Sequence, residues 1–160
     1  DVADTYEDLI TRARNYQPDA TILGVQVQEM VDLDAGVETI VGMNRDPQFG
    51  PLLMFGLGGI FVEVMEDTTF RVAPVSEPEA REMTREIQSA PLLRGARGRD
   101  PVDVDAVVDT IGRLSQLVTD FPAIVELDIN PLVALPDADG EANAAAVDVR
   151  LTVDPETLDS

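Results

Sequence analysis

The period of the hydrophobic pattern changes twice along this chain, and those changes constrain the fold more than any other sequence feature. Between residues 22 and 75 the apolar residues are rich in β-branched types and partly alternate with polar ones, which predicts strands at 22–30, 37–44, 51–56, 59–66 and 68–75. The period becomes helical over 78–88 and 102–118, and strands are predicted again at 123–130, 132–135 and 144–153. Strands at both ends with helices between them predict an α+β fold, a mainly antiparallel sheet packed with two to three helices.

Local signals predict how several of these elements begin and end. Apolar residues at helical spacing predict an amphipathic helix over 2–16, which ends before Pro18. A short acidic turn ending in Gly36 is expected to join strands 22–30 and 37–44 into a hairpin. Ser76 and Glu79 form a capping-box pattern ahead of the helix at 78–88, residues 89–101 are expected to be a loop, and Pro131 is expected to end a strand.

The composition excludes several kinds of chemistry. The chain has 31 acidic residues against 11 basic ones, every base is arginine, and it contains neither histidine nor cysteine. A Schiff-base lysine, a histidine general base and a thiol nucleophile are therefore unavailable within it. A net charge of -20 predicts that neither nucleic acid nor a membrane surface is a partner. With no long apolar run, we expect a cytoplasmic protein, and the acid excess suggests adaptation to high salt.

Oxygen-bearing side chains follow one face of the strand at 123–130. Glu126, Asp128 and Asn130 alternate with the apolar Val125, Leu127 and Ile129. Asp148, on the next predicted strand, is expected close to Asn130 across the sheet. Two interpretations remain open at this point: a plain solvated face, or a magnesium site that completes its coordination with waters and the oxygens of a polyphosphate.

Glycines interrupt the stretch FGLGGIFVE, Phe55 to Glu63. It does not stand between a strand and a helix, so it is not the dinucleotide-binding fingerprint. A tight turn between strands and a backbone contact to an anion both fit the pattern. The apolar set around it is expected to belong to the core rather than to a cofactor pocket, namely Met43, Met54, Phe55, Phe61 and Met65.

Several motifs, taken in order, resemble one family. RDPQFGP, FGLGGIFVE and ELDINPL are the most specific, and GVQVQEMV, LLRGARG and AVDVR accompany them. Together they resemble the ATP-grasp part of NDP-forming acyl-CoA synthetases, the ADP-forming acetate–CoA ligases related to succinyl-CoA synthetase β subunits. The resemblance implies that residues 1–153 form the C-terminal lobe of an ATP-grasp domain and that 154–160 form a tail. It also implies that the N-terminal lobe and the CoA-binding domains lie outside this chain.

The resemblance also implies roles for individual residues. Asn130 and Asp148 match magnesium ligands, and Asp128 matches the acid that stabilises a phosphohistidine. The hinge that contacts adenine matches Gln28, Glu29, Met30 and Val31, and Glu38 lies on the nucleotide-facing strand that follows. Arg45, Gly58, Gly59 and Glu63 match motifs near the phosphates. Arg150 stands where relatives often have lysine, and Arg94 and Arg97 either meet phosphate or anchor a loop.

The implied function is the Mg-nucleotide-binding part of an enzyme that converts acyl-CoA, ADP and phosphate to carboxylate, CoA and ATP through an acyl phosphate and a phosphohistidine. The cofactors are then ATP or ADP and Mg²⁺, with CoA bound by domains outside this chain. The expected partners are the remaining synthetase domains or an α subunit, in an oligomer. Two alternatives remain: a non-catalytic ligand-binding region of a regulator fused to a protein acetyltransferase, and an acidic assembly module.

Overall fold

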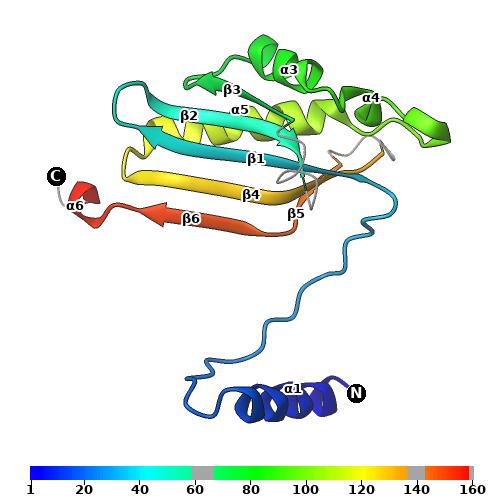
Figure 1. Ribbon diagram of the computed structural model, residues 1–160, viewed down its shortest axis with the longest axis vertical. Helices are drawn as coiled ribbons and strands as arrows, with labels where there is room; N and C mark the ends of the chain where they lie inside the picture. The colour runs from blue at the N-terminus through cyan, green and yellow to red at the C-terminus, as the bar shows by residue number, and fades with distance from the viewer. Residues whose placement is uncertain (59–66, 137–142, 159–160) are drawn as a thin grey trace. The chain divides into compact units, whose positions relative to one another are not determined.

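The computed structural model describes residues 1–58, 67–136 and 143–158, and the chain divides into two compact units, Asp1–Met30 and Val31–Ser160 (Figure 1). The first unit contains helix α1 (Val2–Tyr16), as the helical spacing predicts. The carboxylate of Asp1 caps it by accepting a hydrogen bond of 3.1 Å from the backbone N–H of Ala3. Among the described residues, no helix is both long and apolar enough to cross a lipid bilayer.

The second unit is built on a six-stranded sheet in which every pairing is antiparallel. The strand order is β3-β2-β1-β4-β5, and β6 also pairs with β4, beyond the end of β5. This arrangement confirms the α+β prediction. The strands are β1 (Val37–Asp46), β2 (Gly50–Leu57), β3 (Thr68–Val72), β4 (Ile124–Ala134), β5 (Ala144–Ala146) and β6 (Val149–Val153).

The predicted hairpin between 22–30 and 37–44 is wrong. Residues 22–30 have no regular secondary structure, and their apolar Leu23 and Val27 are largely exposed. Strand β1 has β2 on one side and β4 on the other, so neither edge of β1 is open to residues 22–30. The strand predicted at 59–66 lies outside the described residues.

The helices α3, α4 and α5 pack on one face of the sheet (Figure 1). The capping box of Ser76 and Glu79 is present at the start of α3, and Asp103 caps α5 by accepting from the N–H of Ala106 at 3.0 Å. The expected loop at 89–101 instead contains α4 and the short 3-10 helix η2, separated by Gly95 in the left-handed conformation. The helices are α3 (Glu77–Glu86), α4 (Ala90–Leu93), η2 (Ala96–Gly98), α5 (Val104–Asp120) and α6 (Pro155–Leu158).

The core lies between these helices and the covered face of the sheet. Side chains at alternate positions of β1 and β2 enter it, including Val41, Met43, Leu53 and Phe55, all buried. This confirms the core prediction for Met43 and Phe55. Met54 points to the opposite face and is only half-buried, because its neighbours in the chain occupy the covered face. Phe61 and Met65 lie outside the described residues.

Strand β4 does not end at Pro131, contrary to the sequence expectation. It continues to Ala134, and the carbonyl of Pro131 accepts a hydrogen bond of 3.0 Å from the N–H of Val147. The pairing of β4 with β1 shifts between Thr39 and Val41, opposite Asn130 and Pro131. A bulge at this point lets the strand absorb a residue that has no N–H to donate.

A buried carboxylate joins the start of β3 to the helical layer. Asp67 is 4 % exposed, and its two oxygens accept the backbone N–H groups of Gln88 at 2.6 Å and Ser89 at 2.8 Å. Burial favours the neutral form, but the interactions with Ser89 and Gln88, including these two backbone hydrogen bonds, outweigh it and hold the pKa of Asp67 below its usual value. The charged carboxylate therefore fixes the connection between α3 and α4 to the sheet.

We expect Asp67→Asn to lower the free energy of unfolding by about 1 to 3 kcal/mol at pH 7, because it weakens charge-assisted hydrogen bonds to buried amides. The folded pKa of Asp67 is lowered, so its stabilising effect is complete above the unfolded value of about 3.9 and is lost as pH falls below it. Urea unfolding at pH 7 and pH 3 measures this difference. Asp46→Asn, in an exposed turn where Asp46 also accepts two backbone N–H groups, is the control and should cost less.

Candidate functional site

The uncovered face of the sheet carries one row of side chains across five strand positions. Cross-strand pairing aligns Phe70 of β3 with Met54 of β2, Met54 with Gly42 of β1, Gly42 with Asp128 of β4, and Asp128 with Arg150 of β6. Directly paired residues share a face, with neighbouring strands about 4.8 Å apart. An acid and a base therefore lie beside a glycine and two apolar side chains, on a face that none of the described helices of this unit covers (Figure 1).

Gly42 leaves space in the middle of this row. A Cβ atom at Gly42 would lie 3.5 Å from Oδ1 of Asp128 and 3.5 Å from Cε of Met54, which is ordinary contact distance. Here the surface is hollowed over about 230 Å³, with Asn44 and Glu126 also on its walls. A glycine inside a strand often marks a place where a ligand or another backbone comes close. Gly42 could therefore have been predicted from the sequence, but the sequence analysis did not name it.

The register also brings Asn130 and Asp148 together, as the sequence predicts. The backbone N–H of Asn130 donates to the carbonyl of Asp148 at 3.1 Å, next to the pairs Ile129 with Val149 and Asp128 with Arg150. Among the described residues there is no group of three or more histidine, cysteine, aspartate or glutamate side chains close enough to hold a metal by themselves. One carboxylate and one amide fit Mg²⁺, which commonly keeps waters and takes further oxygens from a substrate.

The negative charges of the acidic side chains on this face repel one another, which makes ionisation of Asp128 less favourable. Burial raises the pKa of Asp128 above its usual value, and the negative charges of Glu126 and Asp148 raise it further, whereas Arg150 opposes the shift. Glu126 is more exposed and accepts a hydrogen bond of 3.3 Å from the hydroxyl of Thr152. The face therefore carries more negative charge than Arg150 balances, which is the electrostatic condition that a bound cation would relieve.

Glu38 and Gly58 line a second cavity, of about 530 Å³, where β1 begins and β2 ends. The N–H of Gly58 donates to the carbonyl of Glu38 at 2.8 Å, and a Cβ at Gly58 would lie only 2.6 Å from the carbonyl oxygen of Thr39. Only glycine fits there without a backbone shift. Gly59 and Glu63, predicted beside Gly58, lie outside the described residues.

Arg99 is a wall residue of this cavity that the sequence analysis did not assign. Its Nη1 donates to the carbonyl of Gly36 at 3.4 Å, and Leu92 and Ala96 stand beside it. Arg94 is exposed, and the side chain of Arg97 lies outside the described part of the chain. The signal that could have found Arg99 is its place in a cluster of three arginines in a chain with 11 basic residues.

The predicted site residues of β1 do not all come together. Glu38 and Gly42 share the uncovered face and lie four residues apart, about 13 Å along the strand. Arg45 lies seven residues from Glu38, about 23 Å away. Its guanidinium donates to the carbonyls of Ile124 at 3.0 Å and Val118 at 2.8 Å, which ties the end of α5 to the sheet.

The predicted hinge, Gln28, Glu29, Met30 and Val31, crosses the boundary between the two compact units. It has no regular secondary structure, and Met30 is 92 % exposed. The role of this hinge in contacting adenine stays a prediction.

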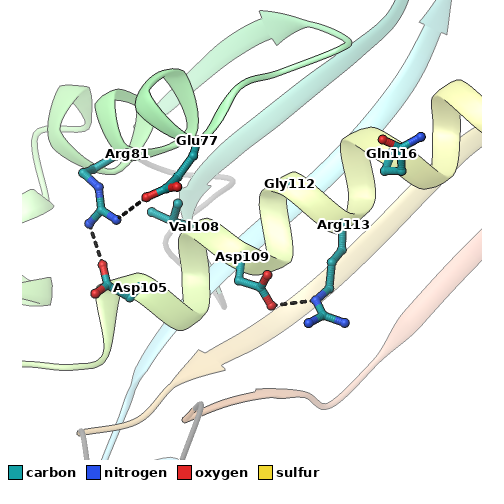
Figure 2. A pocket seen from close by; sticks show the side chains of 8 residues that line it. All are labelled: Glu77, Arg81, Asp105, Val108, Asp109, Gly112, Arg113 and Gln116. Carbon is teal, nitrogen blue, oxygen red and sulfur yellow. Dashed lines mark hydrogen bonds and ion pairs between the residues drawn. The ribbon is translucent and has the colours of Figure 1, made fainter.

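A further groove, of about 490 Å³, lies between α3 and α5 on the outside of the helical layer (Figure 2). Arg81 joins Glu77 at 3.0 Å and Asp105 at 2.5 Å, and Arg113 joins Asp109 at 2.6 Å. Figure 2 shows these ion pairs bridging and flanking the groove. Their charges are already matched, and the groove is on the opposite side of the sheet from Asp128, so we do not assign it to the site.

Comparison with known proteins defines the class to which this fold belongs. Residues 1–153 match the sequence model of a family described as ATP-grasp domain. The chain belongs to the ATP-grasp family.

More particular similarity is to ADP-forming ligases. The chain is 49 % identical over 148 residues to the β subunit of acetate–CoA ligase [ADP-forming] I from Pyrococcus furiosus, covering 92 % of this chain and 61 % of that protein. It is 44 % identical over 156 residues to acetate–CoA ligase [ADP-forming] I from Archaeoglobus fulgidus, covering 98 % of this chain and 22 % of the relative. The chain thus spans about three fifths of the first relative and under a quarter of the second.

A solved relative has the same fold. It is the dinucleotide-forming acetyl-coenzyme A synthetase 1 of Ca. Korarchaeum cryptofilum, in complex with coenzyme A, Ca-AMPCP and HgCl+, with a TM-score of 0.83 and 41 % identity over 94 % of this chain and 62 % of that one. A second complex of that protein holds coenzyme A and Mg-AMPPCP, with the phosphohistidine segment pointing towards the nucleotide-binding site. It matches with a TM-score of 0.69 and 45 % identity, over 74 % of this chain and 53 % of that one.

We expect Asp128→Asn to stabilise the protein at pH 7 by about 0.5 kcal/mol, a value reduced for solvent screening. Because the folded pKa of Asp128 is raised, protonation favours the fold, and that advantage is lost as pH rises through the folded pKa. Asparagine stays neutral and removes the repulsion. Urea unfolding should show the variant and the parent converging near pH 3, with a smaller effect of Glu126→Gln. A less stable Asp128→Asn at pH 7 would contradict this electrostatic account.

Proposed function

We propose that this chain is the Mg-nucleotide-binding C-terminal lobe of the ATP-grasp domain of an ADP-forming acyl-CoA synthetase. The observation that carries the proposal is that Asp128 lies on the uncovered sheet face beside the hollow at Gly42, with the charge of Asp148 close to it and the backbone of Asn130 hydrogen-bonded to that of Asp148. The implied reaction is acyl-CoA with ADP and phosphate giving carboxylate, CoA and ATP. Residues 1–153 form the lobe and 154–160 a tail.

In this proposal Asn130 and Asp148 hold Mg²⁺ through an amide and a carboxylate oxygen. The ion supplies positive charge that neutralises the phosphoryl oxygens during transfer. Gly42 lets the ligand approach the backbone of β1, and Arg150 offsets part of the acid charge beside it. The second cavity, with Glu38 and Gly58, receives the other end of the nucleotide next to the hinge at 28–31.

Asp128 has a different role from the two metal ligands. Its carboxylate is placed to accept a hydrogen bond from the ring N–H of a phosphohistidine, holding the imidazole while its phosphoryl group is exchanged with the nucleotide. The chain contains no histidine, so that residue belongs to another part of the enzyme. A segment of this kind occurs in the Korarchaeum relative, where it points towards the nucleotide-binding site.

The remaining parts of the synthetase supply what this lobe does not. The N-terminal lobe completes the nucleotide site, other domains or an α subunit bind CoA and the acyl group, and the assembly is an oligomer. The relatives extend beyond the region matched here, which supports such partners. Arg45 remains a candidate near the phosphates, although both its described hydrogen bonds go to backbone carbonyls.

The principal test is binding of Mg-ADP, measured by calorimetry on this chain joined to the part of the relatives' sequence that it does not span. Asp148→Asn should weaken the affinity at least about tenfold, because it removes a charged magnesium ligand. Asp154→Asn is the matched control, since the Asp154 carboxylate accepts hydrogen bonds within α6 and should leave the affinity unchanged.

Asp128→Asn separates the two roles in the same experiment. It should bind Mg-ADP normally and lose phosphoryl exchange between nucleotide and histidine. Equal binding by the parent and by Asp148→Asn would remove the metal assignment. No heat from any of the proteins would favour the assembly-module alternative, and a protein acetyltransferase domain on the same polypeptide would favour the regulator.

We infer further that the protein works in a salt-rich cytoplasm. Its net charge of -20 makes the folded state repel itself in dilute buffer, and concentrated salt screens this repulsion. The midpoint of thermal unfolding should therefore rise between dilute buffer and molar KCl. Equal midpoints in the two solutions would contradict the inference.

A further inference from the structure

Strand β6 is an edge strand whose five side chains are all exposed. Within the described residues it pairs with β4 alone, so one side of its backbone faces no strand (Figure 1). An edge of this kind offers unpaired N–H and C=O groups to another chain. A protein must protect such an edge or use it.

The apolar side chains of β6 point to the same face as the core. Val149 pairs with Ile129, Leu151 with Leu127 and Val153 with Ile124, all core or core-packed positions of β4. They nevertheless remain 54 %, 46 % and 37 % exposed, because the helical layer ends before it reaches β6. The sheet therefore continues one strand beyond its helical cover.

Two more exposed apolar side chains extend this surface. Phe121, at the end of α5, is 58 % exposed, and Leu117 one turn earlier is 37 % exposed. The N–H of Ile124 donates to the carbonyl of Phe121 at 3.0 Å, which places Phe121 beside the end of β6 that pairs with Ile124. We call this surface the β6 patch: Leu117, Phe121, Val149, Leu151 and Val153.

Charge indicates what can cover the β6 patch. The chain carries -20, yet β6 contains no acid and one base, Arg150. Two copies that approach through β6 bring two positive charges and no negative ones into the strand contact. Elsewhere on the surface two copies of so acidic a chain repel each other.

The order of residues in β6 fits pairing with itself. In an antiparallel contact centred on Leu151, Val149 lies opposite Val153 of the second copy and Arg150 lies opposite Thr152, so apolar residues meet apolar ones and the two arginines stay apart. This register pairs the whole of β6, which ends at Val153 before α6. Strand β3, at the opposite edge of the sheet among the described residues, lacks this symmetry: centred on Phe70, it sets Thr68 against Val72.

We propose that β6 is a homodimer surface, where a second copy of this chain pairs antiparallel about Leu151 and continues the sheet. The apolar side chains of the two β6 patches then cover each other on the helical face. The polar side of β6, with Arg150, stays on the uncovered face, so the contact does not depend on the proposed nucleotide function.

The register also predicts how salt acts on the dimer. Asp148 of one copy approaches Asp154 of the other at each end of the contact, and both copies carry a large negative charge. Salt screens both repulsions, with a Debye length of about 3 Å at 1 M. The dimer should therefore strengthen as KCl rises.

Sedimentation equilibrium of the 160-residue chain tests association. The dissociation constant should fall about tenfold or more between 0.1 M and molar KCl. Val149→Glu should abolish the dimer, because it places two carboxylates in the apolar contact. Val72→Glu is the matched control on the opposite edge, where Val72 is 48 % exposed, and should leave the dimer intact. A monomer at every salt concentration, or loss of the dimer in Val72→Glu alone, would overturn the proposal.

Cysteine cross-linking tests the register without relying on a charged substitution. The chain has no cysteine, so Leu151→Cys introduces a unique thiol that would face its own copy at a Cβ separation close to that of a disulfide. Val149→Cys is the control, because its own copy would lie about 13 Å away along the strand. Rapid oxidation of Leu151→Cys to a covalent dimer, with slow oxidation of Val149→Cys, is expected. Equal rates for the two variants would refute the register.

Discussion

The pairing of β4 on both its sides determines where the site lies. Leu127 of β4 is buried under the helices, and the next residue, Asp128, points to the uncovered face beside Gly42. Because side chains alternate along a strand, a slip of one residue would bury Asp128 and expose Leu127. Burial of the apolar face thus fixes the register that sets Asp128 between Gly42 and Arg150.

Alternation of side chains made this part of the site predictable. The sequence predicts that pairing with a later strand sets Asp148 next to Asn130, and the structure has a backbone hydrogen bond between these two residues. What alternation cannot show is the bulge at Asn130 and Pro131. Before it, the side chains that join the helical core are at odd positions, Leu127 and Ile129, and after it they are at the even positions Leu132 and Ala134. A proline looked like the end of the strand, whereas the irregular pairing accommodates it.

Other features depend on contacts between distant residues. Residues 22–30 have strand-like composition but no free edge of β1 to pair with, and local sequence does not reveal which edges are occupied. The cavity at Glu38 depends on Arg99 reaching the carbonyl of Gly36, a contact across 63 residues. Position 58 requires glycine because the backbone of Thr39 lies too close for a Cβ atom, and not because the chain turns there. Such requirements follow from packing, and the sequence shows only that a glycine is present.

The same alternation gives β6 two separate faces. Arg150 lies opposite Asp128 on the uncovered face, where it offsets part of the acid charge. Val149 and Leu151, its neighbours in the chain, point to the helical face and remain exposed. A second copy that pairs along the free edge would cover these apolar side chains and leave the row of Asp128 open to ligand. The two functions do not compete, because side chains alternate along β6. Arg150 points to the face that carries Asp128, and the apolar residues that would form the dimer contact point to the other face.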